Sequence, residues 1–393
     1  MRQIVDLHLH SRFSLATSPR MELPEIVRAA EKKGLGLVGT GDLTHRGWMA
    51  HARHLLRPCG DGVYGLAGAR FLVTGEVSVV WREEGRGRRV HFLLVAPSLA
   101  AAARIGRALG RLGKLESDGR PTLACSARAM ADAVWGAARD AVILPAHIWT
   151  PWYSILGARS GFDSLGECLG SYAERIVAVE TGLSSDPGMC RRTRALDGLA
   201  LVSFSDAHAP DRLGREATIL DLEEVSYPAF AAALADPARQ LGTVEFFPEG
   251  GKYFHDGHRA CGVAASPAEA RALGGRCPAC GRVLTRGVLG RVEELAAREV
   301  GERVPPFYPT LTLAEIVAFI LRKRPTSKAV VQTVDALVER YGPELEILLS
   351  RPTGDLVDGA PEGFAEAIAA VRAGRVEAQP GYDGVYGTVR PLV

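Results

Sequence analysis

The sequence predicts an α/β fold over residues 1–235, followed by a cysteine-bearing segment at 236–290 and a helical C-terminal region at 291–393 with a terminal strand or hairpin. Three observations support this prediction. Seven short apolar runs alternate with Ala- and Leu-rich segments of helical length up to about residue 235. Three of the seven cysteines then fall close together, and amphipathic helical patterns follow them.

Each of the seven apolar runs is typical of a strand that is buried on both faces. They read RQIVDL, LGLVGTG, RFLVTGEVSVV, RVHFLLVA, AVILPAHI, ERIVAVETG and LALVSFSD. Continuous β-branched runs separated by helices indicate an α/β barrel or a doubly wound sheet. Between the third and fourth runs, REEGRGR predicts a tight hairpin that joins two antiparallel strands.

The later part of the chain begins where FFPEGGKYFHDG breaks the alternation. TLTLAEIVAFILRKR predicts a helix with Thr310 or Thr312 as its N-cap. TSKAVVQTVDALVERYG predicts another, which Thr326 or Ser327 opens and Gly342 closes. The tail PGYDGVYGTVRPLV combines turn residues with β-branched residues, which predicts a terminal hairpin or strand.

Composition restricts the class of protein. With 47% hydrophobic and 23% charged residues, the chain is typical of a globular protein. No apolar run is long enough to span a membrane, and the N-terminus runs straight into a strand rather than a signal peptide. Seven cysteines without a secretion signal favour a reducing, cytoplasmic location. We expect a monomer.

Charge gives only a weak indication of a partner. The net charge is +2, so the total does not argue for nucleic-acid binding. Residues 250–330 nevertheless hold thirteen Lys or Arg against seven Asp or Glu. A basic patch of this kind can contact phosphates, although a solvated face would have the same composition.

Potential metal ligands follow or interrupt most of the apolar runs. They are His8, His10, Asp42, Glu76, His147, Asp206 and His208. A single His-x-His pair could equally be a polar strand end, but active sites of α/β proteins form at the carboxyl ends of the strands. Ligands from five strands therefore predict a multinuclear metal site, with Glu76 as the best bridging carboxylate.

His91 differs from the other candidates because it opens its apolar run instead of closing it. The antiparallel return of the predicted hairpin would bring His91 back towards Glu76, which makes it a further candidate ligand. A buried core histidine is the alternative.

The DLHLHS start, the Glu76 and His147 segments and the SDAH motif resemble the PHP (polymerase and histidinol phosphatase) superfamily. The resemblance implies a distorted seven-stranded β/α barrel with two or three divalent ions (Zn, Mn or Mg) that hydrolyses phosphate esters. The chain departs from that pattern in two places. It has TGD where T-D-H is usual, so Asp42 stands in for a histidine, and SRFSLATSPRM lacks the usual acidic ligand, which leaves the third metal weaker or absent.

The cysteine cluster predicts a structural zinc site. His258-x-x-Cys261-Gly and Cys277-x-x-Cys280-Gly are each a two-residue-spaced pair followed by glycine, the shape of a zinc knuckle. His255 is the competing fourth ligand. Arg276 and Arg282 lie beside the cluster and either contact DNA phosphates or are merely solvated.

The motifs GTGDLTH, PAHIWTPW, ETGLSSDP, SDAH with LGREA, DGHRACG, CPACG and PGYDGVYG together resemble the endonuclease Q family. This resemblance covers almost the whole chain. It implies an endonuclease that nicks DNA on the 5′ side of deaminated bases (uracil, hypoxanthine, xanthine) and of abasic sites. A metal-activated hydroxide would attack phosphorus in line and leave 3′-hydroxyl and 5′-phosphate ends. The sequence leaves open which lesion is preferred and whether a sliding clamp recruits the chain.

Aromatic residues gather on the loop after His147, which contains Trp149, Trp152 and Tyr153. They either pack the loop against the fold or stack on a nucleotide rotated out of the helix. His45 and Trp48 would lie at the same rim. After SDAH, Arg215 could hold the scissile phosphate, and with Asp206 and Glu76 it completes the expected catalytic set.

Two other functions remain alternatives at this stage. A small-molecule phosphomonoesterase of the histidinol phosphatase type would use the same metals, but it would not need the zinc segment or the helical region. A non-catalytic DNA-binding scaffold would retain the fold while losing ligands, which the nearly complete ligand set argues against.

Overall fold

The structure is a computed structural model that describes residues 1–393. Its centre is a mixed sheet in the order β15-β12-β11-β1-β2-β5-β4-β3, with β6 and β7 paired to β5 and β8 paired to β6. The strands are β1 (Arg2–Asp6), β2 (Leu37–Gly39), β3 (Arg57–Gly60), β4 (Val63–Leu66), β5 (Ala69–Glu83), β6 (Arg86–Ala96), β7 (Thr122–Leu123), β8 (Val142–Pro145), β11 (Ala217–Asp221), β12 (Gln240–Phe246) and β15 (Phe307–Thr310). The sheet thus continues past residue 235, because β12 pairs with both β11 and β15.

All seven apolar runs form strands, which confirms the α/β class. The last two, β9 (Ala178–Glu180) and β10 (Ala200–Val202), pair in parallel only with each other. The strand pairings therefore do not trace the closed seven-stranded barrel that the resemblance implies. One cluster of 18 buried residues nevertheless takes side chains from β1, β2, β5, β6, β8, β9, β10 and β11, so these strands share a core.

The predicted hairpin between the third and fourth runs is confirmed. β5 and β6 pair in antiparallel register from Val73↔Ala96 to Glu83↔Arg86. In this register Leu93 lies opposite Glu76 and His91 lies opposite Ser78, two positions along, so the return strand brings the His91 imidazole within 2.6 Å of Glu76. The register explains how a histidine at the beginning of an apolar run reaches ligands at the ends of others.

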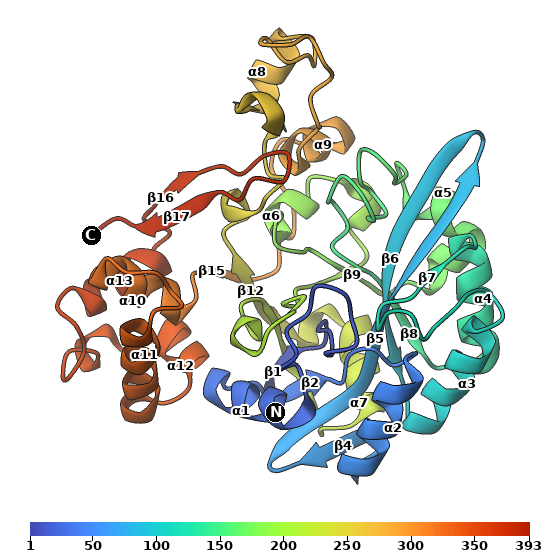
Figure 1. The fold of residues 1–393 in the computed structure, drawn as a ribbon, viewed down its shortest axis with the longest axis horizontal. Helices are drawn as coiled ribbons and strands as arrows, with labels where there is room; N and C mark the ends of the chain where they lie inside the picture. The colour runs from blue at the N-terminus through green and yellow to red at the C-terminus, as the bar shows by residue number, and fades with distance from the viewer.

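Helices cover the strands on the outside (Figure 1). They are α1 (Leu23–Lys33), α2 (Arg46–Leu55), α3 (Leu99–Leu109), α4 (Ala127–Ala137), α5 (Leu165–Leu169), α6 (Pro187–Cys190) and α7 (Tyr227–Ala235). Phe230 and Leu234 of α7 belong to the shared strand core, so α7 closes that core. Short 3-10 helices lie at Gly170–Arg175, Arg194–Leu196, Pro210–Arg212, Pro237–Arg239, Pro248–Gly250, Arg259–Cys261 and Thr353–Asp355.

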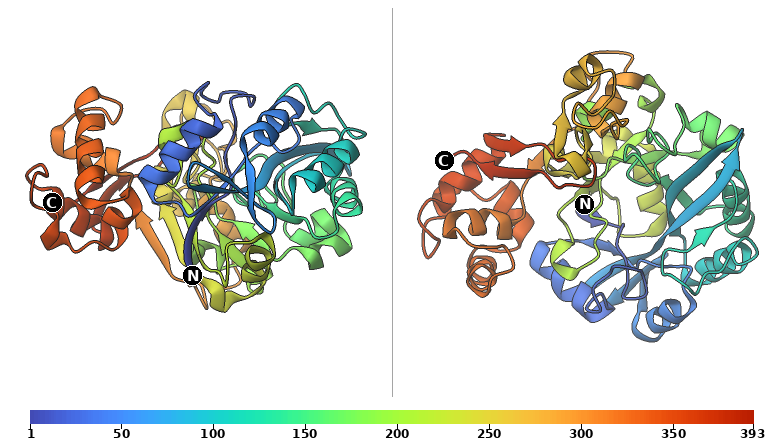
Figure 2. Two further views of the ribbon diagram at one scale, coloured as in Figure 1. Left: turned by 90° about the horizontal axis from the view of Figure 1, so that it is seen from below. Right: turned by 45° about the horizontal axis from the view of Figure 1, so that its top comes forward.

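The cysteine-bearing segment and the C-terminal helices form two lobes beside the sheet (Figure 2). The first contains β13 (Asp256–His258), β14 (Val263–Ala265), α8 (Pro267–Ala272) and α9 (Val288–Leu295). The second contains α10 (Leu313–Leu321), α11 (Lys328–Tyr341), α12 (Glu344–Leu349), α13 (Phe364–Arg372), β16 (Val376–Gln379) and β17 (Thr388–Pro391). None of the helices has the length and hydrophobicity that crossing a bilayer requires.

The sequence signals for the C-terminal elements are confirmed. Of the two threonines proposed, Thr312 caps α10: its hydroxyl accepts the Glu315 backbone N–H in a capping box. Ser327 is the N-cap of α11, and Gly342 ends that helix. The tail forms the antiparallel hairpin β16–β17.

Candidate metal centre

The expected ligands converge where the strands end. His8 and His10 follow β1, His147 follows β8, and Asp206 follows β10, while Glu76 and His91 lie on the β5–β6 hairpin. Because these strands surround one core, their ends meet above it. Long-range strand packing, rather than any local motif, therefore brings the side chains together.

Glu76 lies between two groups of ligand atoms. One group is His8, His10, Glu76 and Asp206, and the other is Glu76, His91 and His147; within each group the ligand atoms lie within 4.8 Å of one another. Glu76 Oε1 is 2.6 Å from His91 Nδ1, whereas Oε2 is 3.4 Å from His10 Nε2. Since each carboxylate oxygen faces a different group, Glu76 has the geometry to bridge two cations.

The residues present fit divalent metal ions. His8 is fully buried, and its Nε2 has no hydrogen-bond partner although it lies 3.5 Å from Glu76 Oε2 and 3.6 Å from Asp206 Oδ1. An unpartnered buried ring nitrogen is unfavourable in a folded protein, and a bound cation would satisfy it. Imidazole and carboxylate ligands together suit Zn, Mn or Mg.

The electrostatics of the centre differ between its ligands. Burial lowers the pKa values of His8, His10 and His147, but the neighbouring carboxylates outweigh it and raise them, so a bound cation would have to displace protons from these rings. Burial opposes ionisation of Glu76, yet the neighbouring His91 and His8 hold the pKa of its carboxyl well below the usual range. Desolvation raises the pKa of the Asp206 carboxyl, which is partly exposed, but His8 and His10 outweigh this and lower it. Burial lowers the pKa of His91 to about 4, which keeps this ring neutral. Ionised carboxylates and neutral imidazoles are the ligand forms.

Two expected ligands, Asp42 and His208, lie outside the two groups. Asp42 Oδ2 accepts the backbone N–H of Ser11 at 2.8 Å, and its Oδ1 is 3.4 Å from His10 Nδ1. In this position Asp42 orients the His10 ring rather than sharing a cation with it. The His208 ring lies 4.4 Å from the His10 ring and borders the centre.

Glu180 has a role that the sequence analysis did not assign. Its Oε1 is 2.9 Å from His8 Nδ1, and its Oε2 accepts the backbone N–H of His147 at 2.7 Å. Glu180 thus fixes the orientation of one ligand and the backbone of another. Its place at the end of an apolar run is the signal that could have identified it.

Arg120 and Asp6 also support the centre, although neither belongs to a recognisable sequence motif. Arg120 Nη1 lies 3.3 Å from Glu76 Oε2, so a loop outside the strands adds a cation to the site. Asp6 accepts the backbone N–H groups of Ser205 and Gly214 at 3.0 and 2.8 Å. Asp6 therefore holds the segment that carries Asp206.

Three candidate residues have left-handed backbone conformations, which non-glycine residues seldom adopt. The φ angles are 48° at Asp42, 30° at His147 and 47° at Asp206. All three are at or just after strand ends. Strain of this kind is concentrated at functional sites, where the surrounding structure maintains it.

A cavity of about 1400 Å³ opens over the centre. His91, His147, Asp206 and His208 line it, together with Arg120, Trp152, Tyr153 and Arg215. Arg215 Nε donates to the Ser205 carbonyl oxygen at 2.9 Å, which holds its guanidinium at the wall. The cavity therefore places two arginines beside the ligand groups.

Three of the expected DNA contacts are buried instead. Trp149 is 1% exposed and Trp48 is 0% exposed, and neither lines the cavity. The Trp48 indole donates to the Gly41 carbonyl oxygen at 2.9 Å, and His45 caps α2 by accepting the Trp48 backbone N–H. These rings pack the fold, whereas Trp152 and Tyr153 face the cavity.

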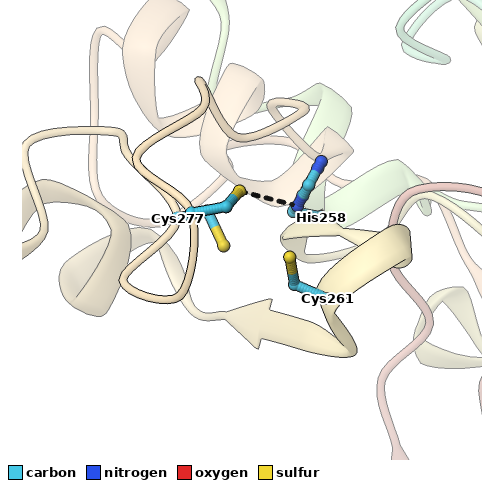
Figure 3. Close-up of side chains that lie close together, drawn as sticks. His258, Cys261 and Cys277 are labelled. Carbon is cyan, nitrogen blue, oxygen red and sulfur yellow. Dashed lines mark hydrogen bonds between the residues drawn. The ribbon is translucent and has the colours of Figure 1, made fainter.

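The second ligand cluster brings His258, Cys261, Cys277 and Cys280 together, with their ligand atoms within 4.8 Å of one another. Figure 3 shows His258, Cys261 and Cys277 pointing towards a common centre. Although desolvation favours the thiol, backbone N–H groups of Ala279 and Cys280 lower the pKa of Cys277 to about 7. A Cys₃His set fits a tetrahedral zinc ion. His258, and not His255, belongs to this set.

The arginines near the cysteine cluster differ in their surroundings. Arg276 and Arg282 are exposed. Arg291 is buried, and its guanidinium donates to the Leu156 carbonyl oxygen at 2.9 Å and to Asp163 at 2.5 Å. It therefore ties α9 to the loop that follows His147.

The chain is similar to proteins of other organisms. Residues 312–375 match the family model of the MJ0043 C-terminal domain. The chain is 30% identical over 250 residues to the uncharacterized protein MJ0043 of Methanocaldococcus jannaschii and 31% identical over 254 residues to the uncharacterized protein YqxK of Bacillus subtilis. These alignments cover 61% and 64% of this chain but only 31% and 61% of those proteins, so the chain spans less than two thirds of either relative.

Two solved structures match over the full chain. One is the lesion-specific endonuclease PfuEndoQ from Pyrococcus furiosus, with a TM-score of 0.88, 32% identity and coverage of 100% of this chain and 96% of that one. The other is Endonuclease Q in complex with a 27-mer duplex that carries an abasic lesion at the active site, with a TM-score of 0.89, 32% identity and coverage of 100% and 97%. On this full-length similarity, the chain belongs to the endonuclease Q family.

Proposed function

We propose that the chain is a metal-dependent DNA endonuclease that hydrolyses the phosphodiester on the 5′ side of deaminated bases (uracil, hypoxanthine, xanthine) and of abasic sites. The observation that carries the proposal is the pair of ligand groups sharing Glu76 at the base of an open cavity. Structures that match the chain over its full length, one of them bound to abasic-lesion DNA, support it.

In this proposal each ligand group holds one ion. His8, His10, Glu76 and Asp206 hold the first, and Glu76, His91 and His147 hold the second. Bound divalent ions supply Lewis-acid stabilisation of the phosphate charge and an activated water nucleophile. Glu180 and Asp42 keep the imidazoles of His8 and His10 in place. Arg215 and Arg120, on the cavity wall, neutralise charge on the scissile phosphate.

The dimensions of the cavity favour a polymer over a small phosphate ester. Small-molecule sites generally enclose about 300–1,000 Å³, and this cavity of about 1400 Å³ is larger. Its walls also include Lys252, Tyr253 and Tyr386, from the cysteine-bearing segment and the C-terminal hairpin. A phosphomonoesterase has no need of these walls, so it is the less favoured alternative.

Incubation with end-labelled duplexes tests the proposal. Duplexes carrying one uracil, hypoxanthine or abasic site are compared with an undamaged duplex, with and without Mn or Mg. We expect a single metal-dependent nick 5′ to the lesion that leaves 3′-hydroxyl and 5′-phosphate ends. Equal cutting of damaged and undamaged duplexes would reduce the activity to that of a general nuclease. Turnover of a chromogenic monoester without DNA cleavage would favour the phosphatase.

A further inference from the structure

The loop of the C-terminal hairpin, Gly381–Gly387, lies against the cysteine-bearing segment (Figure 1). Backbone hydrogen bonds fix it there. The N–H of Gly381 donates to the Glu249 carbonyl oxygen at 2.8 Å, and the N–H of Gly384 donates to the Lys252 carbonyl oxygen at 2.8 Å. Asp383 accepts the Arg259 backbone N–H at 2.7 Å. Backbone hydrogen bonds thus hold the last stretch of the chain beside Lys252, which lines the cavity.

The two tyrosines of this loop have different surroundings. Tyr382 is partly buried and packs so closely over Gly257 that a side chain at that glycine would collide with the ring. Tyr386 is 68% exposed and lines the same cavity as His147 and Asp206. Tyr386 therefore presents an aromatic face to the cavity from a loop whose backbone is held by hydrogen bonds.

Tyr386 is part of a row of cavity-facing groups. The Lys252 ammonium lies 5.6 Å from the Tyr253 ring centre and 5.8 Å from the Tyr386 ring centre. The Tyr253 ring in turn lies 5.6 Å from that of Trp152, on the loop that follows the ligand His147. Aromatic faces interleaved with a cation are the arrangement that binds bases and phosphates of nucleic acid.

We propose that Tyr386 stacks on a nucleobase flanking the lesion while Lys252 contacts a neighbouring phosphate. The inference rests on the proposed function and identifies a nucleobase site on the part of the cavity wall that Lys252, Tyr253 and Tyr386 form. An abasic site offers no base to bind, so contacts to the sugar-phosphate backbone and to the neighbouring bases have to supply the affinity. The exposed ring is placed to supply that affinity because the hydrogen-bonded loop has already fixed its position.

Single-turnover incision of an abasic-site duplex in the presence of Mn or Mg, measured against the concentration of the full-length chain, tests the stacking contact. Stacking on a base typically contributes enough that Tyr386→Ala should raise the half-saturating concentration roughly tenfold, with little change in maximal rate. Tyr386→Phe keeps the ring and should resemble the wild type. Tyr308→Ala removes another exposed tyrosine outside the cavity and is the matched control.

Lys252→Met tests the phosphate contact, since it should reduce the slope of log affinity against log salt by about one. The flanking-base site would be overturned if Tyr386→Ala had the half-saturating concentration of the wild type. It would also be overturned if this concentration rose with uracil-containing DNA but not with abasic DNA. An unchanged salt slope in Lys252→Met would overturn the phosphate contact. Failure of the metal-loaded wild type to nick any lesion duplex would instead overturn the proposed function itself.

Discussion

Glu180 and His8 form a buried carboxylate–imidazole pair, with Oε1 2.9 Å from Nδ1. The pair joins the end of β9 to a residue two positions beyond β1, across 172 positions of sequence. It leaves His8 Nε2 directed at Glu76 and Asp206. A carboxylate behind a ligand imidazole fixes the ring and increases its basicity.

Glu180→Gln should therefore weaken both metal binding and incision by about 10- to 100-fold, because the amide keeps the shape but loses the charge. Metal titration followed by incision assays would measure this. Glu174→Gln, an exposed position on the preceding turn, should have no effect. Wild-type metal affinity in Glu180→Gln would contradict the assigned role.

Asp206→Ala should abolish hydrolysis and leave the fold intact, because it removes a ligand atom from the group around His8 and His10. Asp206→Asn tests whether the loss of activity comes from the carboxylate or from a change of backbone conformation, since asparagine tolerates the left-handed conformation found at this position. Incision, thermal unfolding and metal content are measured together, with the exposed Asp211→Ala as control. Turnover retained by Asp206→Ala at limiting metal would refute the ligand assignment.

Cys277→Ser should release one zinc ion per chain and loosen residues 250–290. A structural zinc site contributes on the order of 10 kcal/mol to the folding of isolated fingers. Elemental analysis and limited proteolysis measure the two effects, and DNA binding should weaken while the metals near Glu76 stay bound. Cys59→Ser, at an exposed cysteine outside the cluster, is the control. Full zinc content in Cys277→Ser would show the assignment to be wrong.

Replacement of Trp149 and of Trp152 should have different consequences. Trp149 is buried, so Trp149→Ala should destabilise the protein by about 3–5 kcal/mol. Trp152 lines the cavity, so Trp152→Ala should lower incision of lesion DNA far more than it lowers metal content or stability. Thermal unfolding and incision assays on both variants separate these effects. If the two variants lost the same stability and kept the same incision activity, Trp152 would not be part of the substrate site.

Glu245 should make stability depend on pH. Burial raises its pKa from 4.5 to about 8, so the folded chain holds a proton that the unfolded chain releases. The free energy of unfolding should then decrease as pH rises between these values. Glu245→Gln removes the titrating carboxyl. Between about pH 5 and about pH 9, the Tm of this variant should therefore fall by several degrees less than the Tm of the wild type. Parallel curves of Tm against pH for the two proteins would contradict the role of Glu245. Glu224→Gln, at an exposed position, is the control.

Much of the architecture could be predicted because it is encoded locally. Continuous apolar runs specified all seven strands, REEGRGR specified the β5–β6 turn, and capping residues specified where α10 and α11 begin. Short spacing likewise specified the zinc ligands. In each of the two pairs the ligands are separated by two residues, so the pairs can bind one ion wherever this segment lies in the fold. Periodicity and capping act over a few residues, so a single sequence displays them.

The tertiary structure decided what depends on contacts between distant segments. It placed Glu76 between two ligand groups, put Glu180 behind His8, and brought Tyr386 to the cavity from the far end of the chain. It also buried Trp48 and Trp149, which the sequence could not distinguish from Trp152. Burial and ligand geometry are properties of how the strands and loops pack on one another, and no local pattern of residues specifies that packing.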